Sequence, residues 1–156
     1  MAGGGPELLD DPVARELLAS TIPARFAYNW KDGTPRVVPI WFHWNGEEVV
    51  MGTLLGAPKL SALQTGDRVA MTIDSNEPPH HVLSIRGTVQ VSEVQGVVPE
   101  YARAAERYLG REQGRAYAAS LPAGIKMGRI AVRPEHLVIL DFETRFPSAV
   151  ASLGEA

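Results

Sequence analysis

Four arginines recur at every fourth position in the second half of the chain, at Arg103, Arg107, Arg111 and Arg115. On one continuous helix this spacing would place the four guanidinium groups along one face. Such a basic stripe could bind an anionic group, or it could be the solvated face of an ordinary helix. Gly110 and Gly114 interrupt the segment, and glycine disfavours a helix interior by about 1 kcal/mol relative to alanine. Both interpretations therefore remain open.

The other residues whose side chains could act in catalysis or bind a metal do not form a pattern typical of either role. His80 and His81 are adjacent, and on a strand their side chains would point to opposite faces. The chain has no cysteine, and its carboxylates do not occur at ligand spacing, so we expect no metal site. Neither Ser61 nor Ser84 lies in a Gly-x-Ser-x-Gly turn, which argues against hydrolase chemistry.

Aromatic residues are concentrated near the middle of the first half. Trp30, Trp41 and Trp44 offer enough aromatic surface for a barrel core or a subunit interface. We interpret His43 and His136 as structural, although alternation with the neighbouring aromatics could let His43 reach a ligand or a partner subunit.

Composition limits the class of protein. A length of 156 residues suits a single domain, and we expect its ordered core over about residues 10–146, with fraying of 1–6 and 148–156. The formal net charge of −3 gives no support for a nucleic-acid partner. No apolar run approaches the roughly 20 residues that span a bilayer. The acidic N-terminus is unlike a secretion signal, so a cytoplasmic location is expected.

Hydrophobic periodicity predicts a mainly β domain. Helices are expected from Pro12, over 59–64, over 99–109 and over 112–120. Strands are expected over 25–30, 36–44, 47–53, 68–75, 80–94, 126–133 and 136–142. Asp32-Gly33 and Asn45-Gly46 are hairpin signals that would join the first three strands into an antiparallel meander. The absence of βαβ repeats makes a doubly wound sheet improbable, and a closed or partly closed barrel would remove the exposed edges.

Several short stretches follow one another in a distinctive order. They are Thr34-Pro35-Arg36-Val37-Val38-Pro39-Ile40, Val50-Met51-Gly52-Thr53, Lys59 with Leu63 one turn later, Ile85-Arg86-Gly87, and Val132-Arg133-Pro134-Glu135-His136-Leu137. Over about Pro12–Phe142, this order resembles the pyridoxamine 5′-phosphate oxidase-like superfamily of flavin and deazaflavin oxidoreductases. The resemblance implies a split β-barrel with flanking helices, of the Greek-key, FMN-binding type.

The same resemblance implies a cofactor site at the interface of a homodimer. Arg36, Val37, Val38 and Pro39 would line the flavin ring. Gly52, Thr53 and Lys59 would hold the phosphate end, with Pro58 beside them. The resemblance also implies an oxidoreductase with FMN as its cofactor and a small-molecule substrate that the sequence does not identify.

Elementary chemistry supports part of this assignment. A phosphate in a groove needs cations and hydrogen-bond donors, because an unpaired buried charge is very costly. Lys59 follows a loop at the start of an expected helix, although a solvated helix residue would have the same position. Arg36 follows a turn, where an exposed arginine is ordinary. Pro39 indicates a strand edge or a ligand-facing position, since proline cannot donate to a sheet ladder.

Two departures from the superfamily bear on the cofactor. The family often has Ser-Arg-Lys at the phosphate, whereas this chain has Ala57-Pro58-Lys59, which predicts weaker phosphate binding or a different cofactor. The C-terminal extension with an Arg-rich substrate strand is missing, so pyridoxamine phosphate oxidation is not expected.

Three alternatives to an FMN oxidoreductase follow. One is a reductase dependent on the deazaflavin coenzyme, whose oligoglutamate tail would meet the arginine stripe. The others are a non-enzymatic flavin carrier and a structural dimer with a degenerate site.

Overall fold

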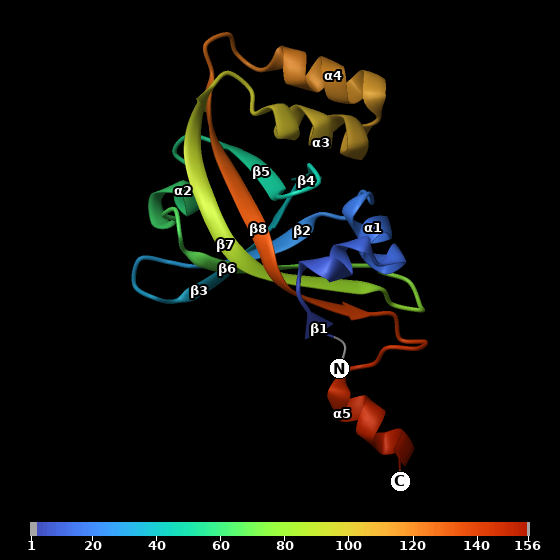
Figure 1. Ribbon diagram of the computed structural model, residues 1–156. Helices are drawn as coiled ribbons and strands as arrows, with labels where there is room; N and C mark the ends of the chain where they lie inside the picture. Colours follow the sequence, from blue (N-terminus) through green and yellow to red (C-terminus); the bar gives the residue numbers. More distant parts are fainter. Residues whose placement is uncertain (1–2, 156) are drawn as a thin grey trace.

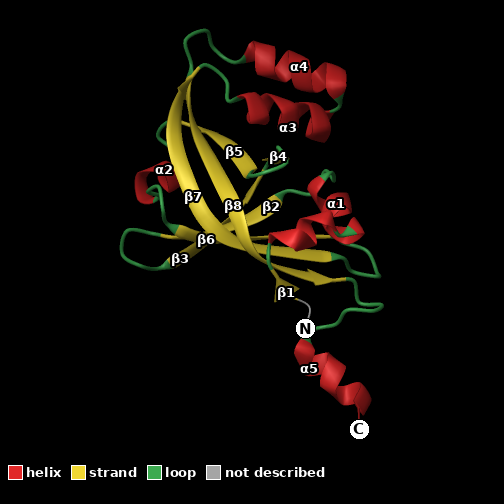
Figure 2. Cartoon of the chain, in the orientation of Figure 1, coloured by secondary structure: helices red, strands yellow, loops and turns green. Residues whose placement is uncertain are grey.

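The computed structural model describes residues 3–155 and consists of one curved antiparallel sheet with helices around it (Figures 1 and 2). The strands are β1 (Gly3–Gly4), β2 (Ala24–Asn29), β3 (Pro35–Ile40), β4 (His43–Trp44), β5 (Val49–Leu54), β6 (Arg68–Asp74), β7 (Val82–Gln95) and β8 (Lys126–Leu140). The helices are α1 (Pro12–Leu18), α2 (Pro58–Ala62), α3 (Pro99–Leu109), α4 (Arg111–Ser120) and α5 (Ser148–Ala151), with 3-10 turns at Pro6–Asp10 and Ser152–Glu155.

The sheet closes on itself because its two ends are joined by only two residues. The strand order is β3-β2-β6-β7-β8-β5-β4, with β1 paired to β8 off this path. Trp41 and Phe42 connect β3 at one end to β4 at the other. Since a residue spans at most about 3.6 Å, the two ends lie within roughly 11 Å of each other. The sheet therefore curls into a barrel that stays unpaired between β3 and β4, which confirms the predicted split β-barrel.

The predicted three-strand meander is interrupted within its middle strand, although both predicted hairpins form, and the Asn45-Gly46 turn joins β4 to β5. Asp32 accepts hydrogen bonds from the backbone N–H and hydroxyl of Thr34, and β2 pairs with β3 as expected. The expected strand over 36–44, however, breaks at Trp41–Phe42, and β5 then pairs with β8. Phe42 is fully buried, so the chain changes direction where this side chain enters the core.

The two expected C-terminal strands form one long strand, β8, because a bulge accommodates Pro134. Arg86 pairs with His136 and Gly87 with Pro134, which leaves Glu135 as an extra residue in the ladder. Proline is tolerated at such a bulge because it has no N–H to leave unpaired. The expected strand over 80–94 begins two residues late, so His80 and His81 lie in the loop before β7.

The hydrophobic core has two parts, one on each side of β5. The larger part fills the barrel and includes Phe26, Phe42 and Met51. The smaller part, around Val50 and Val98, lies between the sheet and α3. Because both faces of β5 are covered, Val49, Val50, Met51 and Gly52 are all buried.

Regular secondary structure extends close to both ends of the described residues, and the expected fraying stays a prediction. Gly3 pairs with Val138 and Gly4 with Leu137 of β8, and Ser148–Ala151 is helical. In Figure 1, α5 projects away from the barrel. Met1, Ala2 and Ala156 lie outside the described residues. Over residues 3–155, no helix is long and apolar enough to cross a membrane.

Candidate functional site

Four of the predicted cofactor residues line one cavity of about 450 Å³. Pro39 comes from the end of β3, Gly52 and Thr53 from β5, and Lys59 from α2. The rest of the lining is Pro23, Ile40, Trp41, Tyr101 and Tyr117. The crossover from β3 to β4 brings these elements together, because it places the end of β3 beside the strand that leads into α2.

Lys59 is the one charged residue in the lining of this cavity. Its side chain is half-buried, and it takes part in none of the ion pairs between the described residues 3–155. Burial removes water from the ammonium group and lowers the pKa of Lys59 below its usual value. A bound anion would stabilise the charged form of this partly desolvated ammonium group. The Thr53 hydroxyl beside it can donate a hydrogen bond to the same anion.

Aromatic side chains from α3, α4 and the crossover form one wall of the cavity. The hydroxyls of Tyr101 and Tyr117 lie 2.9 Å apart, and the ring centroids of both lie 6.1–6.2 Å from that of Trp41. Tyr108 stacks on Trp41 from another side at 5.0 Å. Burial raises the pKa of Tyr101, and the neighbouring Tyr117 hydroxyl adds to the increase. The phenol therefore stays neutral across the physiological pH range.

An ion-pair network holds α3, and with it Tyr101, over the sheet. Arg129 of β8 donates to Glu100 at 2.7 Å and lies 3.7 Å from Glu48. The hydrogen bond from Arg129 lowers the pKa of Glu100. Gly52 lies directly under α3, and a Cβ atom at this position would be 2.7 Å from Tyr101 Cβ. Gly52 therefore allows the close approach of Tyr101, whatever its role toward a ligand.

The other predicted ring-binding residues lie next to this cavity. Val37, Val38 and Pro39 line a second cavity of about 360 Å³, together with Pro23 and Arg25. Pro23 and Pro39 border both cavities, so the two form adjoining parts of one surface. This arrangement brings Val37 and Val38 beside the Lys59 cavity, which Pro39 itself lines.

Two predicted residues do not line either cavity. The Arg36 guanidinium lies 4.0 Å from the ring centroid of Trp30, and its side chain is exposed. Pro58 is the first residue of α2 and is also exposed. The structure thus places Arg36 against an aromatic ring of its own hairpin, where the cation–π contact accounts for its orientation.

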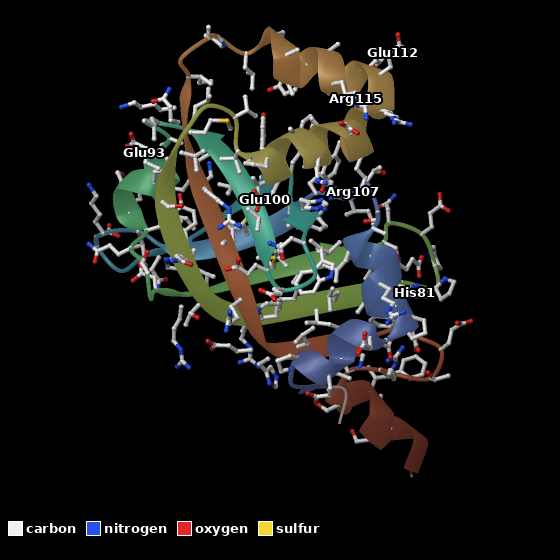
Figure 3. The ribbon with its side chains drawn as sticks, turned by 45° about the horizontal axis from the view of Figure 1, so that its top comes forward. His81, Glu93, Glu100, Arg107, Glu112 and Arg115 are labelled. Atoms are coloured by element: carbon white, nitrogen blue, oxygen red, sulfur yellow. The ribbon has the colours of Figure 1, made fainter. Side chains whose placement is uncertain are left out.

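The four arginines do not form the continuous stripe that their spacing suggests. Gly110, with a φ of +91°, separates α3 from α4. Arg107 points inward and donates hydrogen bonds to the carbonyl oxygens of Ser20 and Phe42, while Arg115 pairs with Glu106 (Figure 3). Arg107 also lies 3.5 Å from Nδ1 of His43, whose pKa is lowered by burial and then by this guanidinium. These contacts give His43 and Arg107 structural roles.

Sequence reasoning missed the aromatic part of the site. The helical spacing of Tyr101 predicts only a residue that packs against the core. Tyr117 belongs to a separate helix, and the sequence pattern places Trp41 within a continuous strand. Figure 2 shows α4 folded back against α3. This arrangement brings the three side chains together at one cavity.

Comparison with known proteins places the chain among split barrels. The sequence profile of the family described as "Pyridoxamine 5'-phosphate oxidase" matches residues 11–137. A search of curated protein sequences finds no match.

Solved structures give the same result for the fold. An F420 reductase shares 26% identity with a TM-score of 0.55, and the match covers 76% of this chain and 90% of that one. A conserved hypothetical protein from Mycobacterium tuberculosis shares 16% identity (TM-score 0.62, covering 81% of each chain). An FAD and heme binding protein from Mycobacterium smegmatis shares 18% identity (TM-score 0.55, covering 100% of this chain and 81% of that one).

Proposed function

The chain belongs to the pyridoxamine 5′-phosphate oxidase family, and we propose that it is an oxidoreductase that binds the deazaflavin coenzyme F420, with FMN as the alternative cofactor. The observation that carries this proposal is the Lys59 cavity. This cavity contains a half-buried lysine that forms no ion pair with the other described residues, and its wall consists of proline and aromatic side chains.

The residues present fit a phosphate-bearing planar cofactor. Lys59 and Thr53 provide a cation and a hydroxyl donor for the phosphate. Pro39, Trp41 and Tyr101 provide flat apolar surface for a ring system. The adjoining cavity along Val37 and Val38 lengthens this surface.

The choice of coenzyme depends on how much phosphate charge must be neutralised. FMN carries a phosphate monoester with a charge of about −1.5 to −2 at neutral pH. The phosphate of the deazaflavin coenzyme is a diester with a single negative charge. Lys59 is the one cation lining the cavity, and Ala57 and Pro58 offer no polar side chain there, so the diester is better matched. The similarity to an F420 reductase supports the same choice.

The protein's part in the reaction is binding and exclusion of water. The cofactor supplies hydride transfer when bound. Lys59 and Thr53 would hold the phosphate. Pro39 and Trp41 would cover the ring system of the cofactor and exclude water from it. Tyr101 stays neutral and shares a hydrogen bond with Tyr117, so this pair offers a hydroxyl donor without a negative charge beside the site.

An absorption titration of the purified protein with each coenzyme tests the proposal. A saturable spectral shift with the deazaflavin coenzyme, followed by turnover with a reductant and an acceptor, is expected. Saturation with FMN alone would favour the alternative. Binding without turnover would identify a carrier, and the absence of binding by either coenzyme would overturn the proposal.

We further propose that the protein acts as a homodimer whose second copy covers β3. Val37 is 66% exposed on this end strand and borders the cavity beside Lys59. A Val37→Glu variant is therefore expected to sediment as a monomer and to bind the coenzyme more weakly. Glu47→Gln, at an exposed turn, serves as the control. A wild-type protein that sediments as a monomer would contradict this assignment.

Coenzyme binding is expected to depend on pH through Lys59. The phosphate attracts the protonated amine, so binding raises a pKa that burial has lowered in the free protein. Affinity should be constant at low pH and fall as pH rises through the free-state pKa of Lys59, which lies below the ordinary value of about 10.4. Titrations from neutral pH to about pH 10 measure this decline. A Lys59→Met variant should lack it, and an equal decline in that variant would assign it to another group.

A further inference from the structure

Another cavity, distinct from the two near Lys59, lies on the outer face of the sheet. It has a volume of about 620 Å³ and is bordered by β2, β3, β6, β7 and β8. Its polar lining consists of Asn29, Arg68, Arg86, Glu135 and His136, and it shares no lining residue with the two cavities near Lys59. Within one protomer it is therefore a separate cavity from the candidate cofactor site.

The bulge in β8 determines which side chains reach this cavity. In a regular strand, neighbours such as Glu135 and His136 point to opposite faces. Here Glu135 is the extra residue opposite the Arg86–Gly87 step, and both Glu135 and His136 line the cavity. A Cβ atom on Gly87 would overlap the carbonyl oxygen of Arg133. The close strand contact that produces the bulge thus requires glycine at position 87.

The lining of this cavity carries more positive than negative side chains, which favours an anionic ligand. Arg68 and Arg86 lie on the same outward face of neighbouring strands, and neither takes part in an ion pair between the described residues. The one carboxylate in the lining, Glu135, accepts a hydrogen bond from the Thr88 hydroxyl at 2.9 Å. Two guanidinium groups and the Asn29 amide are therefore free to donate to a ligand.

We propose that this cavity binds a small phosphorylated organic molecule. Arginine forks match the oxygens of a phosphate and hold it by charged hydrogen bonds. Ala27, Pro35 and Ala70 line the remainder of the cavity and provide apolar surface for the organic part. This site is independent of the proposed function and would hold even for a protein that binds no flavin.

Isothermal titration with phenyl phosphate tests the proposal on the native protein in its own assembly. Arg68→Gln and Arg86→Gln are each expected to weaken binding by about three- to tenfold, because both side chains are exposed and water screens their charged hydrogen bonds. Glu135→Gln should strengthen binding, since it removes the only negative charge from the lining. Arg68 and Arg86 are exposed, so these variants are expected to fold normally, which their melting temperatures check.

Two matched variants show whether phenyl phosphate binds at this cavity. Arg133→Gln removes the same charge from an exposed residue of β8 outside the lining and should leave affinity unchanged. Lys59→Gln weakens coenzyme binding, and since the Lys59 cavity can itself take a phosphate, this variant should leave intact the binding event that Arg68→Gln and Arg86→Gln weaken. An equal loss in Arg133→Gln, a loss confined to Lys59→Gln, or no saturable binding would each overturn the proposal.

Discussion

Lys59→Gln is expected to weaken binding of the deazaflavin coenzyme by about 10- to 50-fold. A hydrogen bond to a charged group contributes about 1.5–3 kcal/mol, and the lower half of this range applies because Lys59 is only half-buried. The amide keeps most of the side chain's size but removes the one charge in the cavity lining. Isothermal or absorption titration of the purified variant measures the change in dissociation constant.

Two further lysine variants make this result specific. Lys59→Arg keeps the positive charge and should lose less affinity than the glutamine variant. Lys31→Gln removes a charge from an exposed residue of the β2–β3 turn and should bind as tightly as the wild type. An unchanged affinity in Lys59→Gln, or an equal loss in Lys31→Gln, would show that the phosphate is held elsewhere.

The local elements of the fold were predictable because short-range patterns determine them. Asp32-Gly33 forms the expected hairpin turn, and Asp11 caps α1 by accepting a hydrogen bond from the backbone N–H of Val13. Gly110, which interrupts the arginine segment in the sequence, divides α3 from α4. These features depend on residues within a few positions of one another.

Strand pairing was less predictable because it depends on contacts distant in sequence. Nothing in the spacing of β3 and β4 shows that they lie at opposite ends of the sheet path. Pro134 favours two strands, and only the bulge opposite Gly87 explains how one strand continues through it. The spacing of Arg107 fits a solvated stripe, yet carbonyl groups of Ser20 and Phe42 from distant segments bind its guanidinium.

The candidate site also has a part that the sequence predicts and a part that depends on contacts distant in sequence. The order of motifs predicted that Pro39, Gly52, Thr53 and Lys59 would converge, and they line one cavity. Their roles toward a cofactor remain predictions. The aromatic wall escaped prediction because it requires α4 to lie against α3, a contact that depends on the absence of a side chain at one glycine.

Gly114→Ala is expected to destabilise the protein and to disrupt this aromatic wall. Helix propensity alone would favour alanine by about 1 kcal/mol within α4. Gly114 is buried against α3, however, and a Cβ atom there would overlap backbone atoms of Glu106, which cannot move aside as a flexible side chain could. The helices must separate, and overpacking of this kind costs about 1–3 kcal/mol.

Thermal unfolding and coenzyme titration together test this packing argument. A net loss of about 1 kcal/mol, which is the overpacking cost less the gain in helix propensity, would lower the melting temperature by roughly 2–4 °C in a chain of this size. Separation of α4 from α3 would also break the 2.9 Å contact between Tyr101 and Tyr117, so coenzyme affinity should fall as well. Gln113→Ala, at the exposed neighbouring position, should leave both quantities nearly unchanged. A higher melting temperature in Gly114→Ala would mean that propensity outweighs packing and that the two helices are free to move apart.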